Sequence, residues 1–313
     1  MIRWALTQVA TYQVKEYGLE RSPMGYFTRR EVLRLAAAGF AGVAGARLAR
    51  AAVGRRFETR NSLAYRDAVL AKGPVAYWRL GESDGPTAFD ETQNAYDGTY
   101  IGNSTFGQLG AIQNDPDTAI QCNGQDYVEI PDSLDFSQPT SGQGLSVEVW
   151  LRPDALIFPG QTSDPYVHWL GKGVRGQFEW ALRFYSQDTS RPNRISAYIW
   201  NPVGGEGAGA YFQDELAVGE WIHVVACYEP GDKDTDPPAG VHIYKNGVHR
   251  LGPPSSGTLY RTFDIVPAHG TAPVRLGTRD LGSFLLGGLD EVAIYPRVLT
   301  PDEVLENYNA GIS

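Results

Sequence analysis

From residue 75 onward the sequence is a succession of short runs rich in β-branched and aromatic residues, each bounded by Gly, Pro, Asn or Asp. Such runs favour pleated strands, and the bounding residues favour turns. The composition agrees, with 36 Gly, 20 Pro and 17 Tyr among 313 residues. We therefore predict an all-β fold. Eleven strands are expected, over residues 75–80, 119–122, 127–130, 145–152, 167–170, 178–185, 195–200, 221–228, 241–244, 274–276 and 289–295.

Two local motifs predict a turn and a helix. Asn246-Gly247 predicts a type I′ hairpin, because both central positions of that turn require positive φ. Thr300–Glu303 combines an N-cap, a proline at the first helical position and a capping-box acid, and Gly311 supplies a stop signal. The sequence therefore predicts a short C-terminal helix.

The first 51 residues differ from the remainder in charge. They contain eight Lys or Arg against three Glu, a net charge of +5, so the formal −9 of the whole chain leaves −14 for residues 52–313. Thr28–Arg34 resembles a twin-arginine export motif. It is followed by the mildly apolar run Leu35–Leu48 and by Ala49–Ala51, an A-x-A cleavage pattern. We expect a twin-arginine-type signal peptide whose removal leaves Ala52 as the first residue.

An ordinary amphipathic helix is the alternative for this segment. Three glycines within the run disfavour it, since each costs about 1 kcal/mol in a helix interior: Gly39, Gly42 and Gly45. The run is also shorter than the roughly 20 residues of a membrane span, so no stable membrane insertion is expected after cleavage. The residues before Met24 are interpreted as a start-site artefact.

The remaining chain divides into a connector and one domain. Residues 52–72 are the connector, in which Asn61-Ser62 can cap a short helix through Ala71, and residues 73–313 form the domain. An acidic body repels phosphate backbones at long range, which argues against nucleic acid and anionic membranes as partners. We expect an exported protein located in the periplasm, outside the cell or at its surface.

Five motifs follow one another in the order found in laminin-G-like jelly-roll domains of the concanavalin A-like lectin/glucanase superfamily. Their residues are Pro74–Glu82, Asp126–Pro131, Leu145–Pro153, Trp221–Ala226 and Gly288–Tyr295, the last running into the helix that begins with Leu299-Thr300. This resemblance covers residues 73–311, and by it the sequence is identified as a member of this superfamily. The resemblance implies a concanavalin-like antiparallel β-sandwich, a closing strand that returns near the first strand, and recognition of carbohydrate or protein outside the cell.

The sequence departs from this pattern at its two cysteines. Cys122 stands where the family usually has an aromatic residue, and Cys227 stands where a small polar residue is common. Both are interpreted as core or near-core replacements. In an oxidising compartment they pair only if their Cα atoms lie within about 7 Å; otherwise each is an ordinary buried thiol.

Related sandwiches include glycoside hydrolases, which use two carboxylates that project from the same face of a strand. The strand over residues 145–152 has one acid, Glu148, and the adjacent Asp290 and Glu291 are expected to point to opposite faces. No metalloprotease or nucleophile-elbow motif occurs. We therefore predict that the protein is not an enzyme.

A binding surface is the functional prediction, because several strands alternate apolar residues with aromatic and polar ones. Sugars present apolar C–H faces ringed by hydroxyls, which suits such a mixed face. The candidate ligand-binding residues are Trp150, Tyr185, Tyr198, Trp200 and Tyr244, with Arg183 and Glu148 as polar contacts. A glycan groove requires the five aromatic side chains to be exposed on one concave face. The alternative is a structural or assembly protein, in which they are buried.

Calcium is the one cofactor that the sequence suggests. Asp90, Asp97 and Asp290 are expected to approach one another if the first long loop meets the closing strand, and Ca²⁺ takes six to eight oxygen ligands. The same aspartates also suit turns and caps. Asp232–Asp236 resembles a metal loop but lacks the glycine and distant glutamate of an EF-hand, so it is interpreted as a solvated turn.

Overall fold

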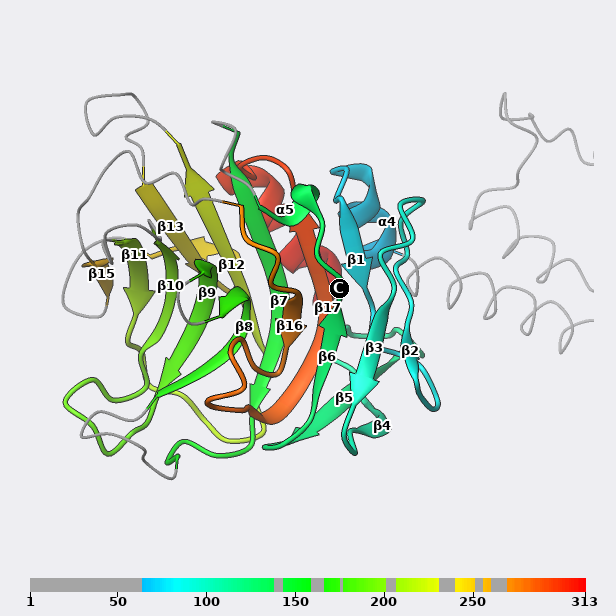
Figure 1. The fold of residues 1–313 in the computed structure, drawn as a ribbon, viewed down its shortest axis with the longest axis horizontal. Helices are drawn as coiled ribbons and strands as arrows, with labels where there is room; N and C mark the ends of the chain where they lie inside the picture. The colour runs from blue at the N-terminus through cyan, green and yellow to red at the C-terminus, as the bar shows by residue number, and fades with distance from the viewer. Residues whose placement is uncertain are drawn as a thin grey trace, which may run out of the picture. The chain divides into compact units, whose positions relative to one another are not determined.

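A computed structural model describes residues 64–137, 143–158, 166–174, 177–200, 207–230, 240–250, 256–259 and 269–313. The predicted export leader, most of the connector and the acidic turn 232–236 lie outside these residues. Within them the chain forms two antiparallel sheets packed face to face, with two helices (Figure 1). The predicted all-β sandwich with a short C-terminal helix is confirmed.

The first sheet has eight strands and contains the closing strand at its centre. Its order is β14 (Val248–His249), β13 (Gly240–Lys245), β12 (Ile222–Glu229), β7 (Leu145–Pro153), β17 (Leu286–Tyr295), β5 (Thr118–Asn123) and β4 (Thr105–Leu109), and β1 (Ala76–Trp78) also pairs with β17. The closing strand β17 thus returns beside the first strand of the sandwich, with Tyr77 opposite Ala293. This pairing brings residues far apart in sequence into one sheet.

The second sheet has nine strands. Its order is β15 (Ser256–Leu259), β11 (Gly207–Phe212), β10 (Ile195–Trp200), β9 (Gln177–Tyr185), β8 (Tyr166–Val174), β16 (Val274–Leu276), β6 (Tyr127–Ile130), β3 (Gly98–Ile101) and β2 (Thr87–Ala88). A 3₁₀ turn, Leu134–Phe136, follows β6. Every pairing in this sheet is antiparallel.

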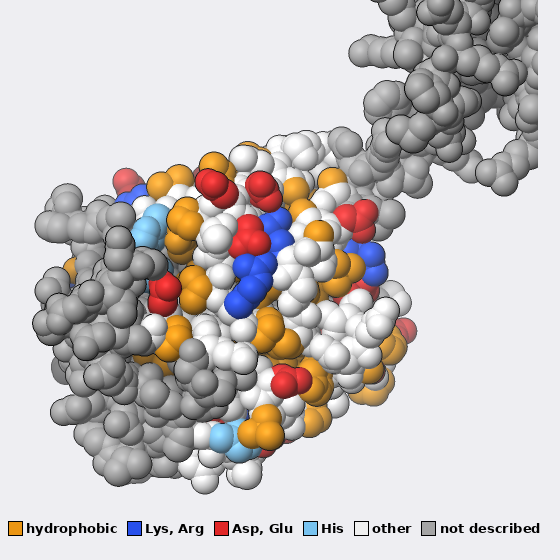
Figure 2. All heavy atoms as spheres, turned by 90° about the horizontal axis from the view of Figure 1, so that it is seen from above, with side chains coloured by type: hydrophobic (Ala, Val, Ile, Leu, Met, Phe, Trp, Pro, Cys, Tyr) orange, Lys and Arg blue, Asp and Glu red, His pale blue; other side chains and the backbone are white. Residues whose placement is uncertain are grey.

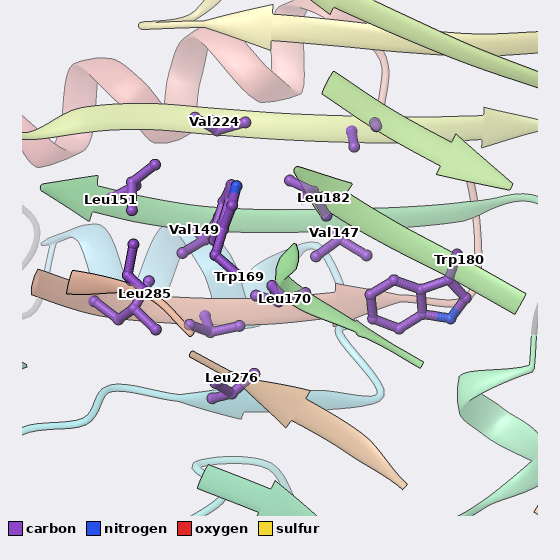
Figure 3. Close-up of a cluster of buried hydrophobic side chains, with 14 of the residues drawn as sticks. Val147, Val149, Leu151, Trp169, Leu170, Trp180, Leu182, Val224, Leu276 and Leu285 are labelled. Carbon is purple, nitrogen blue, oxygen red and sulfur yellow. The ribbon is translucent and has the colours of Figure 1, made fainter. Parts of the chain in front are cut away.

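The core lies between the two sheets, where alternate side chains of each strand point inward. From β7, Val147, Val149 and Leu151 face Trp169 of β8 and Leu182 of β9, and all five are fully buried (Figure 3). The alternation read from the sequence of residues 145–152 therefore identifies the inward face correctly.

A second apolar cluster lies on the other face of the eight-stranded sheet, under the helices α4 (Ala64–Ala71) and α5 (Pro301–Gly311) (Figure 1). Tyr65 of α4 and Val304 of α5 pack there with Trp150 and Tyr295 of the sheet. The strands β7, β12 and β17 are consequently buried on both faces. Among the described residues, no helix has the length and apolar character needed to cross a membrane.

The C-terminal helix begins as predicted. The Thr300 hydroxyl accepts a hydrogen bond from the Glu303 amide, and the Glu303 carboxylate accepts one from the Thr300 amide, at 2.9 Å. The helix ends at Gly311, as predicted, but Gly311 is its last helical residue and does not adopt the left-handed conformation of a glycine cap. It is required for packing instead, since a Cβ there would lie 2.7 Å from the Trp150 ring.

All eleven predicted strands are present, with bounds that shift by a few residues. The Asn246-Gly247 turn joins β13 to β14 with φ of 51° and 77°, which confirms the hairpin. The sequence did not predict β2, β3, β4, β11, β14 and β15. Most of these are short, and β11 is rich in Gly and Ala, which carry no β-strand signal.

The two cysteines do not form a disulfide. Both are free and fully buried, as the interpretation as core replacements predicted. Cys122 lies in the core between the sheets, whereas Cys227 lies in the cluster under the helices. They therefore point to opposite faces of the eight-stranded sheet.

Candidate functional site

The five aromatic candidates fall on two different sheets. Trp150 and Tyr244 belong to the eight-stranded sheet and are 3% and 4% exposed. Tyr185, Tyr198 and Trp200 belong to the nine-stranded sheet, where the first two are buried and Trp200 is partly exposed. The requirement for one shared exposed face is therefore not met, because the terminal helices cover the first group.

The candidate Glu148 lies in a closed polar network under the helices. Its carboxylate accepts hydrogen bonds from Tyr65, His223, Tyr295 and Asn307, at 2.7 to 3.0 Å. Burial alone would raise the pKa of Glu148, but the hydrogen bonds and the charge of His223 outweigh it and hold the pKa below its usual value. The side chain is fully buried, so it stabilises the packing of α4 and α5 and does not reach solvent.

The closing strand contains a β-bulge at Glu291, which has a φ of 54°. Leu289 and Val292 both point into the core, so the extra residue breaks the alternation. Asp290 pairs with Trp150, and Glu291 accepts a hydrogen bond from Tyr77, and both partners belong to the cluster under the helices. The expectation that these acids point to opposite faces is wrong, because the bulge places both on the outer side of the sheet.

Glu291 and its neighbours form a buried ionic network. The Arg79 guanidinium donates to Glu291 and Asp115 at 2.8 Å and lies 3.0 Å from Asp117. Burial raises the pKa of Glu291 to about 7, although Arg79 and Tyr77 act in the opposite direction. With side-chain exposures of 1% for Glu291 and 3% for Asp115, the network joins β1 to β17 away from solvent.

The three candidate calcium ligands do not converge in this structure. Asp90 accepts hydrogen bonds from the amides of Tyr77, Thr92 and Tyr96, and its own amide donates to Asp97. Asp290 instead accepts from the Ala111 amide at 2.7 Å. Among the residues that the structure describes, no group of three or more His, Cys, Asp or Glu side chains is arranged to hold a metal ion.

These residues therefore do not fit calcium as one ligand set. The loop around Asp90 is held by its own hydrogen bonds. Calcium binding stays a prediction, which melting curves in chelator and in millimolar calcium would test.

The outer face of the nine-stranded sheet brings the other candidates together with residues that the sequence did not single out. We call it the arginine–aromatic face, and it consists of Tyr166, His168, Arg183, Tyr185, Tyr198, Trp200 and Arg279. These side chains are outside the core cluster, whereas their strand neighbours Val167, Leu182 and Ile199 are inside it. Strand alternation thus presents the six strand residues on one side, and Arg279 reaches them from the connection between β16 and β17.

Two glycines in β11 make room for the rings of this face. Tyr198 lies opposite Gly209 and Trp200 lies opposite Gly207. A Cβ added at Gly209 would stand 3.2 Å from the Tyr198 ring, and one at Gly207 would stand 3.3 Å from the Trp200 ring. The two rings stack with their centroids 5.4 Å apart and an interplanar angle of 17°. The glycines therefore allow an aromatic platform that larger residues would displace.

Guanidinium groups lie on this platform. The Cζ atom of Arg183 is 3.5 Å from the centre of the Tyr198 ring and 5.0 Å from that of Tyr166. Arg279 lies 5.0 Å from the centre of the Trp200 ring and hydrogen-bonds to Asp280 at 2.5 Å. Cation–π contacts of this kind are favourable when they are desolvated.

A cleft opens beside the arginine–aromatic face. Its volume is about 540 Å³, and its lining includes Tyr166, His168, Asp280 and Ser283. His168 Nδ1 is 3.8 Å from the Asp280 carboxylate, yet burial, followed by the charge of Arg279, lowers the pKa of His168 well below its ordinary value. The imidazole is therefore neutral at pH 7, and the cleft offers both apolar and hydrogen-bonding surface.

The sequence-based prediction found part of this face. Alternation along β9 and β10 identified Arg183, Tyr185, Tyr198 and Trp200. The strand carrying Tyr166 and His168 was predicted over residues 167–170 only, whereas β8 extends from Tyr166 to Val174, and its alternation was not used. Arg279 and Asp280 lie in the connection between β16 and β17, where no periodicity marks a side chain as directed toward a sheet.

The face of the molecule seen in Figure 2 carries mixed charges. Figure 2 shows Lys and Arg side chains next to Asp and Glu, with hydrophobic side chains scattered between them. No patch of a single sign stands out among the residues coloured there. Such a surface does not by itself indicate a partner.

Comparison with solved structures shows the same fold in proteins of low sequence identity. A receptor-binding domain shares 11% identity with a TM-score of 0.55, over 80% of this chain and 53% of its own. The binding domain of botulinum neurotoxin DC, solved with rat synaptotagmin II, shares 11% identity with a TM-score of 0.53, over 77% of this chain and 52% of its own. This chain thus spans about half the length of these two structures.

Domain 4 of AbnA, a GH43 extracellular arabinanase from Geobacillus stearothermophilus solved with arabinotriose, shares 22% identity with a TM-score of 0.48, over 75% of this chain and 98% of its own. No curated protein matched the sequence. Residues 123–305, more than half of the chain, match the family described as the concanavalin A-like lectin/glucanases superfamily. Together with the two-sheet sandwich, this match shows that the chain belongs to the concanavalin A-like lectin/glucanase superfamily.

Proposed function

We propose that the protein is an exported, non-catalytic recognition module that binds a carbohydrate or a surface glycoconjugate at the arginine–aromatic face. The observation that supports this most is the stacked pair Tyr198 and Trp200 beside a cleft of about 540 Å³. A sugar ring can place its apolar face on an aromatic platform while its hydroxyls reach polar groups, and His168, Asp280 and Ser283 line the cleft.

The burial and hydrogen bonding of the acidic side chains favour recognition without catalysis. A glycosidase needs two carboxylates that face the same substrate. Glu148 and Glu291 are buried and hydrogen-bonded within the fold. Asp280 is the acid in the lining of the cleft, and it is bonded to Arg279. An assay that detects hydrolysis of a bound glycan would overturn this part of the proposal.

A structural or assembly module is the second candidate. It is favoured by one specific observation, the low exposure of Tyr198 and Arg183, which are 1% and 8% exposed. In that case the same contacts would serve only to stiffen the nine-stranded sheet. The two candidates assign different roles to the partly exposed Trp200: it contacts the glycan in the first and only stabilises the sheet in the second.

Trp200→Ala separates the two candidates, with Trp221→Ala as the matched control. Both tryptophans are partly exposed and each carries an arginine, Arg279 at 5.0 Å over Trp200 and Arg152 at 5.1 Å over Trp221. We expect Trp200→Ala to weaken glycan binding about tenfold, the equivalent of ~1.4 kcal/mol, and Trp221→Ala to leave it unchanged. Glycan arrays and thermal melting of the wild type and both variants provide the measurement.

The recognition proposal fails if the wild type binds no glycan, or if Trp200→Ala binds as well as the wild type. A loss of stability of about 3 to 5 kcal/mol in Trp200→Ala without an effect on binding supports the structural module. Export is tested separately. N-terminal sequencing of the exported protein is expected to start at or near Ala52, and an intact leader would contradict it.

A further inference from the structure

Two buried guanidinium groups of the arginine–aromatic face have N–H groups that find no hydrogen-bond partner within the described part of the chain. Arg183 is 8% exposed and Arg279 is 2% exposed. Among the residues that the structure describes, Nε and Nη2 of Arg183 and Nε and Nη1 of Arg279 have no hydrogen-bond partner. Leaving a charged donor buried and unpaired is costly, so buried arginines are normally paired. These two groups therefore need an explanation.

The aromatic contacts do not satisfy these donors. Arg183 lies over the ring of Tyr198 at 3.5 Å, and Arg279 lies over Phe178 at 4.3 Å. A ring stacked on a guanidinium covers its flat face, whereas the N–H bonds point outward in the guanidinium plane. The rings thus orient both guanidinium groups, and their buried N–H bonds are not paired with an acceptor of the described residues.

The local charge favours an anion as that acceptor. Asp280 is bonded to Arg279. Among the described residues, Asp280 supplies the carboxylate next to these two arginines. His168 adds no charge at pH 7, since burial and Arg279 lower its pKa. Two positive groups therefore face one negative group, in a body whose formal charge is −14. Burial, with the nearby charge of Arg183 also contributing, lowers the pKa of Arg279, as expected for a cation lacking sufficient counter-charge.

We infer that the arginine–aromatic face recognises an acidic saccharide, whose carboxylate binds Arg183 and Arg279 while its ring lies on the aromatic platform. This inference rests on the proposed function and specifies the class of ligand. A carboxylate matches the fork of a guanidinium in geometry and charge, and it supplies acceptors for donors that otherwise have none. A neutral sugar would leave the excess positive charge uncompensated.

The test compares acidic sugars with neutral sugars of the same skeleton. Oligogalacturonate and its methyl ester form one pair of probes, and sialyllactose and lactose form another. Isothermal titration of the full protein at two salt concentrations measures the dissociation constants. We expect at least one acidic member to bind roughly tenfold to hundredfold more tightly than its neutral partner, with a difference that shrinks at high salt.

Arg183→Gln and Arg279→Gln remove the charge and keep a hydrogen-bonding side chain. Arg152→Gln is the matched control, because Arg152 also lies over a ring, Trp221, but on the eight-stranded sheet, and it donates to Gln121 and Asp154. Each of the first two variants should lose most of the preference for the acidic sugar. Arg152→Gln should retain it. Melting curves show whether each variant is folded.

The outcomes distinguish the inference from the proposal on which it depends. Equal binding of acidic and neutral members overturns the inference and leaves glycan recognition standing. Binding to none of the four sugars counts against both. A preference for acidic sugars that survives in both arginine variants, with the variants folded, also overturns the inference, since the carboxylate would then be bound elsewhere. If a variant does not fold, the salt dependence of the wild type decides.

Discussion

Asp290 has a buried environment that its sequence context does not indicate. It is 2% exposed, its Oδ2 accepts a hydrogen bond from the Ala111 amide, and none of the described residues donates to its Oδ1. Burial, followed by the charge of Glu291, raises its pKa well above the ordinary value. A single unpaired carboxylate oxygen in such a place is tolerated most easily when it carries a proton.

This environment predicts a pH dependence of stability. A carboxyl group whose pKa is raised by folding stabilises the folded state while it is protonated, and the contribution is lost as the pH rises through the folded pKa. For Glu291 the window extends from about 4.5 to about 7. Asp290 contributes in the same direction. These two groups should therefore make the protein less stable at pH 8 than at pH 5.

Asp290→Asn tests this directly, because asparagine resembles the protonated acid and keeps an acceptor for Ala111. We expect its free energy of unfolding to match that of the wild type near pH 3.5, below the ordinary aspartate pKa of 3.8, and to exceed it by about 1 kcal/mol or more at pH 8. Urea unfolding at both pH values gives the comparison, with the exposed Asp67→Asn as the control. Parallel pH profiles for Asp290→Asn and the wild type would show that Asp290 is ionised in the folded protein.

The pattern within single strands was enough to predict most residues of the candidate site on the nine-stranded sheet. In β9 and β10 the alternation holds without a break, so the outward positions of Arg183 and Tyr198 follow from counting. The same counting sent Glu148, Trp150 and Tyr244 outward. It could not show that α4 and α5 cover much of that side, because this depends on how distant segments pack.

The bulge in β17 shows a second limit of strand patterns. The sequence from Leu286 to Tyr295 reads as one continuous strand, and the register shift follows from its pairing with β7. The positive φ of Glu291 has no glycine or asparagine to announce it. Asp290 and Glu291 were therefore predicted to point to opposite faces of the sheet, whereas both point to the same face. Sequence motifs predicted the structure correctly where it depends only on neighbouring residues, as at the Asn246-Gly247 turn and the Thr300 helix cap.

The cap of α5 leads to a prediction for that element. Thr300→Ala removes the side-chain acceptor of the Glu303 amide and should lower the free energy of unfolding by about 1 kcal/mol. Chemical denaturation measures this loss. Thr99→Ala, at an exposed position in β3, should change it by less than about 0.5 kcal/mol. Equal values for the two variants would mean that α5 is held by its apolar face and that its cap contributes nothing.

At the scale of the whole molecule, the eight-stranded sheet separates two apolar regions. One side faces the nine-stranded sheet, and the other side faces the helices. Where a sheet is covered on both faces, side chains at successive positions are buried, as they are along β7 and β12. Small residues fit best where both regions are crowded, which accounts for a cysteine on each side of the sheet.

The separation of the cysteines yields the last prediction. The protein should have two free thiols even after export to an oxidising compartment, because side chains on opposite faces of one sheet cannot approach the geometry of a disulfide. Burial raises the pKa of Cys227 to about 12 and that of Cys122 further, so both thiols should be inert in the folded state. A thiol reagent should titrate no cysteine in native protein and two per chain in guanidinium, and reductant should leave the melting temperature unchanged. A single band shift on reduction, or fewer than two thiols in unfolded protein, would require the two strands to be arranged differently.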